Sequence, residues 1–239
     1  MKIIGIIPAR YDSVRLPGKP LADINGKPMI QHVYESAKRS ALLSRFIVAT
    51  DSSLIYDAVL KFGGEAIMTS SSHNSGTERI AEAIKNIEAD IIVNIQGDEP
   101  FIDASNIDMA VKPLINGKDI LLSTLAIRFT KLDDVKDPNK VKVVFDKNNI
   151  AMYFSRSVIP YGTGKEYYKH IGLYVYRKEF LNDISNLKKS KLEESEKLEQ
   201  LRFLDNGYRI KVVVTDKDSV SVDTEEDLEV VRSFEQNKY

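Results

Sequence analysis

Three cations stand close together just after the first apolar run of the sequence. The segment IIPARYDSVRLPGKPL, residues 6 to 21, carries Arg10, Arg15 and Lys19 around a Pro-Gly pair, against the single acid Asp12. Guanidinium forks and backbone N–H groups of a glycine-containing loop can bind phosphate oxygens. The segment therefore predicts a site for a nucleoside triphosphate, and a solvated surface loop is the alternative interpretation.

Two acids that can hold a metal ion against such phosphates lie far apart in the sequence. Asp98 follows Gly97 in NIQGDEP, where glycine lets the backbone approach a ligand, and Asp223 occurs in SVDTEED. Mg²⁺ is usually held by one or two carboxylates together with phosphates and waters. Asp98 also suits a turn. Asp223 and Glu226 resemble a capping box, unless Thr224 caps the helix and leaves Asp223 free. These alternatives remain open.

Two further stretches combine a structural and a binding interpretation. In HNSGTERI, residues 73 to 80, Ser75 and Glu78 have the spacing of a capping box. The same helix start offers backbone donors to a base or phosphate, and Arg79 adds positive charge. In HIGLYVYR, period two sends the Ile171 side to the core and the His170 side, with Gly172, Tyr174 and Tyr176, to the opposite face. A histidine there is either a hydrogen-bonded bystander or, with Tyr174, part of a pocket for a polyhydroxylated ligand.

The elements that must position these residues follow from the apolar pattern. Strands are expected at 2–8, 45–51, 65–70 and 90–98, where continuous Ile- and Val-rich runs indicate burial on both faces. The intervening segments have apolar residues at helical spacing, namely Met29, Ile30, Val33, Tyr34 and Ala37, then Leu54, Ile55, Ala58, Val59 and Phe62, then Ile80, Ala83, Ile84 and Ile87. Alternating strands and helices predict a doubly wound α/β fold with a mostly parallel sheet. Ligands bind at the carboxyl ends of such strands, which is where Arg10 and Asp98 fall.

The pattern changes from about residue 118. Apolar stretches with little helical spacing follow one another until about residue 178, which predicts an inserted antiparallel β subdomain within a single domain spanning residues 1–239. A final helix, strand and helix complete the chain. The first of these helices is expected over 192–207, with Asn206-Gly207 as its C-cap.

Composition excludes several classes of function. The chain has 34 Lys plus Arg, 35 Asp plus Glu, a net charge of -1 and no cysteine. The charge balance gives no basis for nonspecific binding to nucleic acid or to an anionic membrane, and the missing cysteines exclude disulfides and thiolate metal sites. No apolar run reaches the ~20 residues of a membrane span, so a soluble cytoplasmic protein is expected. Gly18-Lys19-Pro20 lacks the Ser or Thr of a phosphate-binding P-loop.

The motifs taken in order resemble a known family. IIPARYDSVRLPGKPLADINGKPMI, SGTER, VNIQGDEP, YFSR, HIGLYVYR, LEQLR and VDTEEDL are similar to the 3-deoxy-manno-octulosonate (Kdo) cytidylyltransferases over essentially the whole chain. The resemblance implies transfer of CMP from CTP to the sugar acid Kdo with release of pyrophosphate, a requirement for Mg²⁺ and a nucleotide-sugar-transferase-like fold. It also implies a homodimer, with a contact through the antiparallel insert, and a place in lipopolysaccharide precursor synthesis.

The resemblance also implies residue roles. Arg10, Arg15 and Lys19 would bind the triphosphate, Ser75 and Gly76 the cytidine, and Asp98 and Asp223 the metal, with Lys19, Asp98 and Asp223 as the catalytic set. The sugar acid would be surrounded by Gln96, Arg156, His170, Tyr174, Glu199 and Gln200. Two alternatives remain: a CTP-dependent enzyme for another keto sugar acid, sialic-acid-like or 8-amino-substituted, and a noncatalytic nucleotide-binding module.

Overall fold

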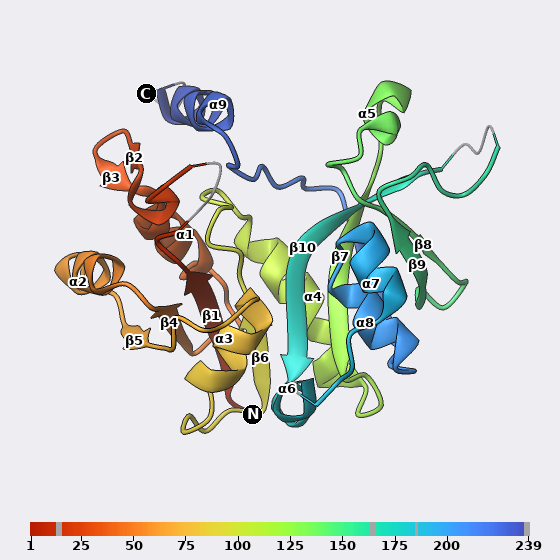
Figure 1. The fold of residues 1–239 in the computed structure, drawn as a ribbon, viewed down its shortest axis with the longest axis horizontal. Helices are drawn as coiled ribbons and strands as arrows, with labels where there is room; N and C mark the ends of the chain where they lie inside the picture. The colour runs from red at the N-terminus through yellow and green to blue at the C-terminus, as the bar shows by residue number, and fades with distance from the viewer. Residues whose placement is uncertain (13–15, 163–165, 185, 237–239) are drawn as a thin grey trace. The chain divides into compact units, whose positions relative to one another are not determined.

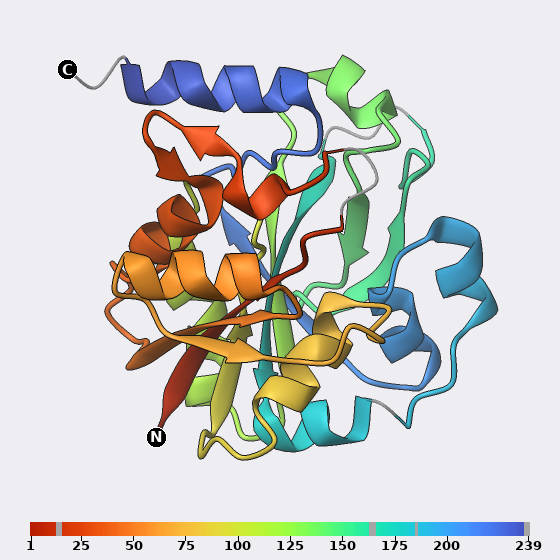
Figure 2. The same cartoon turned by 60° about the vertical axis from the view of Figure 1, so that its left-hand side comes forward.

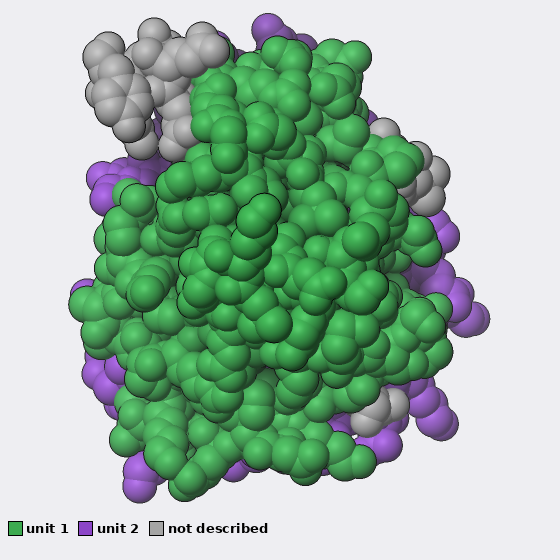
Figure 3. Space-filling view, turned by 90° about the vertical axis from the view of Figure 1, so that its left-hand side faces the viewer, with its two compact units in different colours: residues 1–108, 219–239 green, residues 109–218 purple. Residues whose placement is uncertain are grey.

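The computed structural model describes residues 1–12, 16–162, 166–184 and 186–236. The chain divides into two compact units, coloured separately in Figure 3. Unit 1 comprises residues 1–108 and 219–239, and unit 2 comprises residues 109–218. The chain therefore leaves unit 1 after its first 108 residues and returns to it for the C-terminal helix.

Unit 1 alternates strands and helices along the chain. In chain order its elements are β1 (Ile3–Ala9), the 3-10 helix η1 (Lys19–Leu21), β2 (Asp23–Ile24), β3 (Lys27–Pro28), α1 (Met29–Ala37), β4 (Arg45–Thr50), α2 (Ser53–Lys61), β5 (Ala66–Met68), α3 (Gly76–Ala83), β6 (Ile91–Asn94) and α9 (Glu225–Gln236). Helix α4 (Ala104–Asn116) contains the boundary between the units. The four predicted strands and the helices between them are confirmed.

The strands of unit 1 form a parallel sheet in the order β6–β1–β4–β5 (Figure 1). Ile6 of β1 lies opposite Ile47 of β4 and Asn94 of β6, so the carboxyl ends of these strands share one edge. β1, β4 and β6 are buried almost throughout, as their apolar runs predict. The same prediction is wrong for β5, because this strand ends the sheet order and leaves Met68 47% exposed.

The helices of unit 1 bury the faces that the apolar spacing predicts, with one exception. All five apolar positions of α1 are buried. In α2 the buried face is narrower than expected, because Ile55 and Val59 are buried while Leu54 is exposed. His32 of α1 is buried and its Nε2 lies 2.9 Å from the carbonyl oxygen of Ile24, so this histidine has a structural role.

Helix α9 packs beside the β2–β3 hairpin, as Figures 1 and 2 both show. The Asn25 side chain donates to the Arg232 carbonyl at 2.9 Å, and Arg232 Nε donates to the Asp23 carbonyl at 3.0 Å. An apolar cluster lies beneath these contacts, formed by Ile24, Met29, Val222, Leu228 and Val231. This packing brings the segment just before α9 to the region of η1, although about 200 residues separate the two in sequence.

Unit 2 is built mainly from antiparallel strands. Its elements are β7 (Leu122–Arg128), α5 (Leu132–Lys136), β8 (Lys142–Phe145), β9 (Ala151–Ser155), β10 (Tyr168–Arg177), α6 (Lys178–Ile184), α7 (Lys191–Glu196), α8 (Gln200–Asp205) and β11 (Ile210–Thr215). β10 pairs antiparallel with β7 and β8, and β8 pairs antiparallel with β9. β11 joins β7 in parallel. Antiparallel pairing after residue 118 is thus confirmed, with one parallel strand added from the C-terminal side.

The helix expected over 192–207 is two short helices. Ser190 Oγ caps α7 by accepting from the Glu193 N–H at 3.0 Å, and α7 ends where Lys197 adopts a left-handed φ of 56°. Arg202 of α8 then reaches back to Glu193 of α7, with Nε 2.8 Å from the carboxylate. This buried ion pair holds the two helices together across the break. The predicted C-cap is confirmed, since Gly207 has a φ of 82°.

Candidate active site

A cleft of about 470 Å³ opens in unit 1 at the carboxyl ends of the parallel strands. Its walls come from the end of β1, the start of η1, the first turn of α3, the turn after β6 and the segment before α9. It collects the residues that the sequence singled out in this unit, namely Arg10, Lys19, Ser75, Gly76, Gln96, Asp98 and Asp223. Arg15, predicted to bind the triphosphate, lies outside the described residues.

Lys19 sits between the two acids proposed as metal ligands. Its Nζ lies 2.7 Å from Asp98 Oδ2 and 3.2 Å from Asp223 Oδ1, and it also donates to the Val222 carbonyl at 2.9 Å. The Lys19 side chain is only 14% exposed, against 29% and 35% for the two acids. The carboxylates therefore converge on one cation, although 125 residues of sequence separate them.

The position of Asp98 depends on the glycine that precedes it. A Cβ on Gly97 would lie 2.8 Å from the Pro8 carbonyl oxygen, closer than side chains tolerate. The missing side chain thus lets the turn after β6 approach the end of β1. Gly97 also lines the cleft, so its close approach to a ligand stays a prediction. The Asp98 carbonyl accepts from the Val222 N–H at 2.9 Å, which joins this turn to the C-terminal segment.

The capping alternatives at Asp223 are resolved by the hydrogen bonds before α9. Thr224 Oγ1 accepts from the Asp227 N–H at 3.2 Å, and Asp227 Oδ2 accepts from the Thr224 N–H at 2.9 Å. Thr224 and Asp227 therefore form the reciprocal capping box. Because Thr224 caps the helix, the Asp223 carboxylate is directed to Lys19.

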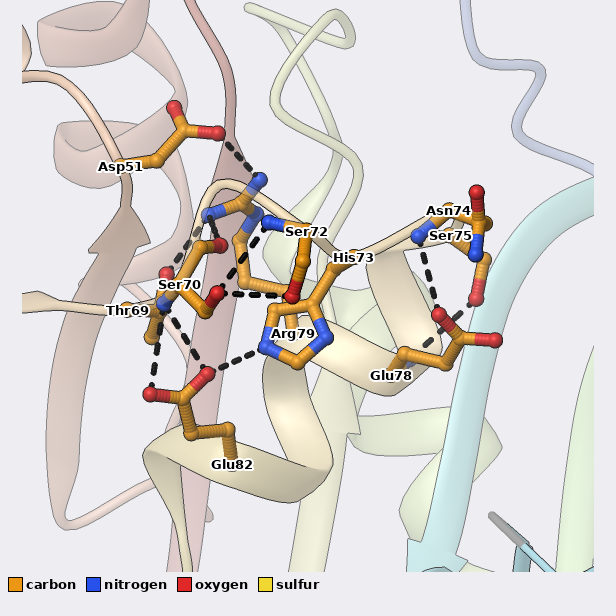
Figure 4. Close-up of polar contacts among 10 residues, drawn as sticks. All are labelled: Asp51, Thr69, Ser70, Ser72, His73, Asn74, Ser75, Glu78, Arg79 and Glu82. Atoms are coloured by element: carbon orange, nitrogen blue, oxygen red, sulfur yellow. Dashed lines mark hydrogen bonds and ion pairs between the residues drawn. The ribbon is translucent and has the colours of Figure 1, made fainter.

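The start of α3 forms another wall of the cleft, and Figure 4 shows the polar contacts of its first residues. Ser75 Oγ accepts from the Glu78 N–H at 3.2 Å, which confirms the predicted N-cap, and the Glu78 carboxylate accepts from the Asn74 N–H at 2.9 Å. A Cβ on Gly76 would lie 3.2 Å from Pro8 Cγ, so the first turn of α3 rests against the end of β1. The cap and the cleft wall are the same residues, so helix capping and ligand contact can coexist here.

Arg79 has partners that the sequence did not reveal. Its Nη2 lies 2.6 Å from Asp51 Oδ2, and its Nη1 donates to Thr69 Oγ1 at 2.6 Å and to the Ser70 carbonyl at 3.3 Å (Figure 4). The positive charge expected to serve a ligand is therefore matched by Asp51. This pair ties the ends of β4 and β5 to α3, and no local spacing rule predicts a contact between residues 28 positions apart.

His73 lines the cleft beside Arg79 and was not selected from the sequence. Its Nε2 contacts the Glu82 carboxylate, which also accepts from the Ser70 N–H at 3.0 Å (Figure 4). The hydrogen bond from His73, together with that from Ser70, holds the pKa of Glu82 below its usual range. His73 precedes the capping box by two residues, and that proximity is the one signal that could have marked it.

In unit 2, His170 and Tyr174 come together on β10 as predicted. Their ring centroids are 5.4 Å apart, and His170 Nε2 lies 2.9 Å from Thr124 Oγ1. Burial, with the nearby charge of Lys169, lowers the pKa of His170 to about 3. Burial likewise raises the pKa of Tyr174, whose hydroxyl has no hydrogen-bond partner within the part of the chain that the structure describes. Both groups are therefore neutral near pH 7.

The alternation expected for β10 is only partly right. Tyr174 and Tyr176 are as buried as the Ile171 face, with exposed fractions of 8% and 0%. A register shift between Ile171 and Tyr174 interrupts the period of two, and the two tyrosine rings stack 5.9 Å apart. β10 is consequently buried on both faces over this stretch.

The other residues of unit 2 that are predicted to bind the sugar acid are Arg156, Glu199 and Gln200. Arg156 donates through Nε to the Glu196 carbonyl at 2.8 Å and through Nη1 to the Pro138 carbonyl at 3.0 Å. Glu199 stands at the N-terminus of α8, and its charge contributes to the raised pKa of Tyr174. Gln200 is buried at 6% exposure. Their role toward a sugar acid stays a prediction, as does that of Gln96 in the cleft of unit 1.

A parallel α/β sheet with a basic loop and two convergent acids at its carboxyl edge is the arrangement of a nucleotidyltransferase. The sequence profile of the family described as Cytidylyltransferase matches residues 4–238. The chain is 51% identical to the 3-deoxy-manno-octulosonate cytidylyltransferase of Parabacteroides distasonis, with 100% of both chains covered. It is 50% identical to the protein of the same name from Trichlorobacter lovleyi, over 95% of this chain and 96% of that one.

A solved structure agrees with these relatives. CMP:2-keto-3-deoxy-manno-octonic acid synthetase complexed with CTP matches with a TM-score of 0.96 at 42% identity, and the match covers 100% of both chains. The chain belongs to the cytidylyltransferase family, among the 3-deoxy-manno-octulosonate cytidylyltransferases, which confirms the resemblance and the α/β fold class inferred from the sequence.

Proposed function

We propose that this protein transfers CMP from CTP to 3-deoxy-manno-octulosonate and releases pyrophosphate. The anomeric hydroxyl oxygen attacks the α-phosphorus, the bond from that phosphorus to the bridging oxygen breaks, and the hydroxyl proton is lost to solvent. The family relationship supports the reaction, and the convergence of Lys19, Asp98 and Asp223 in the cleft is the observation that carries it. The product would supply an activated sugar for lipopolysaccharide synthesis.

The basic residues of the cleft suit such a displacement. Negative charge moves onto pyrophosphate as the bond breaks, and positioning with charge neutralisation dominates catalysis of phosphoryl and nucleotidyl transfer. Arg10 and Lys19 both line the cleft and would provide that positive charge. A preorganised donor of this kind is typically worth ~3 kcal/mol of transition-state stabilisation.

The acid pair fits a magnesium ion that is shared with the nucleotide. Carboxylate oxygens are the hard donors that Mg²⁺ prefers, and it keeps several waters or phosphate oxygens beside one or two carboxylates. Among the described residues no group of three or more His, Asp or Glu forms a fuller metal cage. Asp98 and Asp223 would therefore hold the ion together with triphosphate oxygens. When bound, Mg²⁺ would neutralise phosphate charge and lower the pKa of a coordinated hydroxyl.

In unit 2 the Tyr174 hydroxyl suits a hydroxyl group of a sugar acid, and the Arg156 guanidinium suits its carboxylate. The Tyr174 hydroxyl is buried and unpartnered among the described residues, so a bound hydroxyl group would satisfy it. The Arg156 guanidinium has five N–H donors, and Nε and Nη1 each give one to a backbone carbonyl. Its remaining donors would be available to a carboxylate. These two residues support the proposal that the acceptor substrate is a sugar acid.

The homodimer and the cytoplasmic location implied by the resemblance are also part of the proposal. No helix within the described ranges has the length and apolar character to cross a bilayer. Light scattering on the purified chain would measure the oligomeric state directly, and a monomeric mass at micromolar concentration would remove the dimer from the proposal.

The decisive experiment supplies CTP, Kdo and Mg²⁺ and measures product mass against a control without sugar. A CMP adduct of Kdo with equimolar pyrophosphate is expected. If pyrophosphate were released with another keto acid but not with Kdo, that keto acid would be the acceptor substrate. Tight CTP binding without any release would indicate a noncatalytic module.

Substitution of the acids tests the catalytic assignment. Asp98→Asn and Asp223→Asn should each lower turnover far more than CTP affinity, because the charges act on the reacting phosphate. Near-normal turnover in both variants would refute the two-carboxylate site.

A further inference from the structure

The Lys19 ammonium uses all of its donors inside the cleft. A lysine ammonium has three N–H groups, and those of Lys19 meet three acceptors: Asp98 at 2.7 Å, Asp223 at 3.2 Å and the Val222 carbonyl at 2.9 Å. The proposed function needs the same ammonium to meet triphosphate oxygens and the same carboxylates to meet a divalent ion. The two sets of contacts compete for the same atoms.

The Lys19 ammonium offsets the repulsion between the Asp98 and Asp223 carboxylates. Two carboxylates directed at one point repel each other, and a cation between them offsets that repulsion. One ammonium leaves the three side chains with a net charge of -1, whereas a divalent ion on the two carboxylates balances them. A divalent ion and the ammonium cannot share the point between the acids, because like charges this close repel strongly. Metal entry therefore requires the ammonium to leave.

The surrounding backbone allows that movement without rearrangement of the cleft. The Lys19 N–H donates to the Leu16 carbonyl at 3.1 Å, and Pro20, the next residue of η1, is buried. The Asp98 carbonyl is held by the Val222 N–H at 2.9 Å. The Lys19 side chain has four flexible bonds beyond this fixed backbone, so rotation about them can carry Nζ out of the acid pair.

We propose that Lys19 is a displaceable internal cation, which holds Asp98 and Asp223 together and exchanges with the divalent ion that enters with the nucleotide. The proposal rests on the function stated above and adds an order of events to it. Asp98 and Asp223 would hold the ion, and the released Lys19 ammonium would meet the triphosphate oxygens. Lys19 thus weakens metal binding to the protein alone, and bound CTP raises metal affinity because its phosphates accept the ammonium. By thermodynamic reciprocity, the metal raises CTP affinity by the same factor by which CTP raises metal affinity.

A permanent structural salt bridge is the competing explanation, and the two differ in sign. If Lys19 only holds the acids in place, its removal lets them separate and metal binding weakens or stays the same. If Lys19 competes with the metal, its removal takes one positive charge away from the two carboxylates and metal binding becomes tighter.

Mn²⁺ is a suitable probe, because it accepts the same oxygen ligands and free Mn²⁺ is measured directly by electron paramagnetic resonance. The full-length chain, without nucleotide or sugar, is titrated as wild type and as Lys19→Met, which keeps an apolar side chain of similar length. Lys27→Met is the matched control, since Lys27 forms an exposed ion pair with Glu35 at 2.8 Å and does not line the cleft. Lys19→Gln replaces Lys19→Met if the latter does not fold.

We expect Lys19→Met to bind Mn²⁺ at least about tenfold more tightly than the wild type, and Lys27→Met to have an unchanged Mn²⁺ dissociation constant. Adding Asp98→Asn to Lys19→Met should abolish the increase in Mn²⁺ affinity. Equal or weaker Mn²⁺ binding in Lys19→Met overturns the exchange. A gain that survives Asp98→Asn overturns it as well. The Mn²⁺ titration contains neither CTP nor Kdo, so its result does not depend on the activity assay. If CTP and Kdo gave no pyrophosphate, the proposed function would be refuted, but the exchange of Lys19 with the metal would not.

Discussion

The ion pair between Arg79 and Asp51 offers the sharpest test of the packing in unit 1. The pair is well buried, with side-chain exposures of 5% and 17% and a separation of 2.6 Å. Asp51→Asn preserves the size of the side chain and removes the carboxylate charge that pairs with the buried guanidinium. Breaking a buried pair in this way costs about 3–5 kcal/mol. We expect about 3 kcal/mol, because Arg79 retains Thr69 and Ser70 as acceptors.

That loss should be measurable by thermal melting. For a chain of this size about 1 kcal/mol corresponds to a shift of about 2–4 °C, so Asp51→Asn should lower the melting temperature by roughly 6–12 °C. Glu65→Gln is the matched control. It breaks the ion pair between Glu65 and Arg45, which lies in the same strand region. Because the two side chains are 43–44% exposed, the loss should be under about 1 kcal/mol. Equal, small shifts in the two variants would show that burial of the Arg79 pair contributes nothing to stability.

Three further outcomes follow from single contacts. Thr224→Ala removes the capping box with Asp227 and should lower the melting temperature by about 2–4 °C, corresponding to about 1 kcal/mol; an unchanged value would exclude the cap. Gly97→Ala places a Cβ 2.8 Å from the Pro8 carbonyl, and should cost about 1–3 kcal/mol and reduce turnover; normal values of both would disprove the close approach. His170 has a folded-state pKa of about 3, against about 6.5 when unfolded, so the unfolded chain binds more protons between these values. The free energy of unfolding should therefore rise with pH there, by up to about 1.4 kcal/mol per pH unit from this group, and denaturant titrations of His170→Gln should show a slope smaller by that amount. An identical slope would contradict the low pKa.

Much of unit 1 could be predicted because its signals are local. Continuous Ile- and Val-rich runs marked β1, β4 and β6, and the spacing of Ser75 and Glu78 marked the start of α3. Such patterns depend on the few residues that share a strand face or a helical turn, so the sequence displays them directly. The same locality explains the errors, since the exposure of β5 depends on which strand ends the sheet.

The second half was harder because its structure depends on contacts between distant residues. The helix expected over 192–207 is divided by a left-handed Lys197 and is held by a pair between α7 and α8. Both faces of β10 are buried after a register shift that no periodic pattern indicates. Local spacing describes one element at a time, whereas these features arise where two elements meet.

By itself the sequence determined the fold class, the family and the identities of the charged residues that now line the cleft. Tertiary structure alone decided how those charges pair: Lys19 with two acids that are 79 and 204 residues away, and Arg79 with Asp51. The physical reason is that an ion pair depends on separations of a few ångströms in space. Those separations are set by strand order, turn geometry and the return of the C-terminal segment, and the spacing of residues along the chain does not contain them.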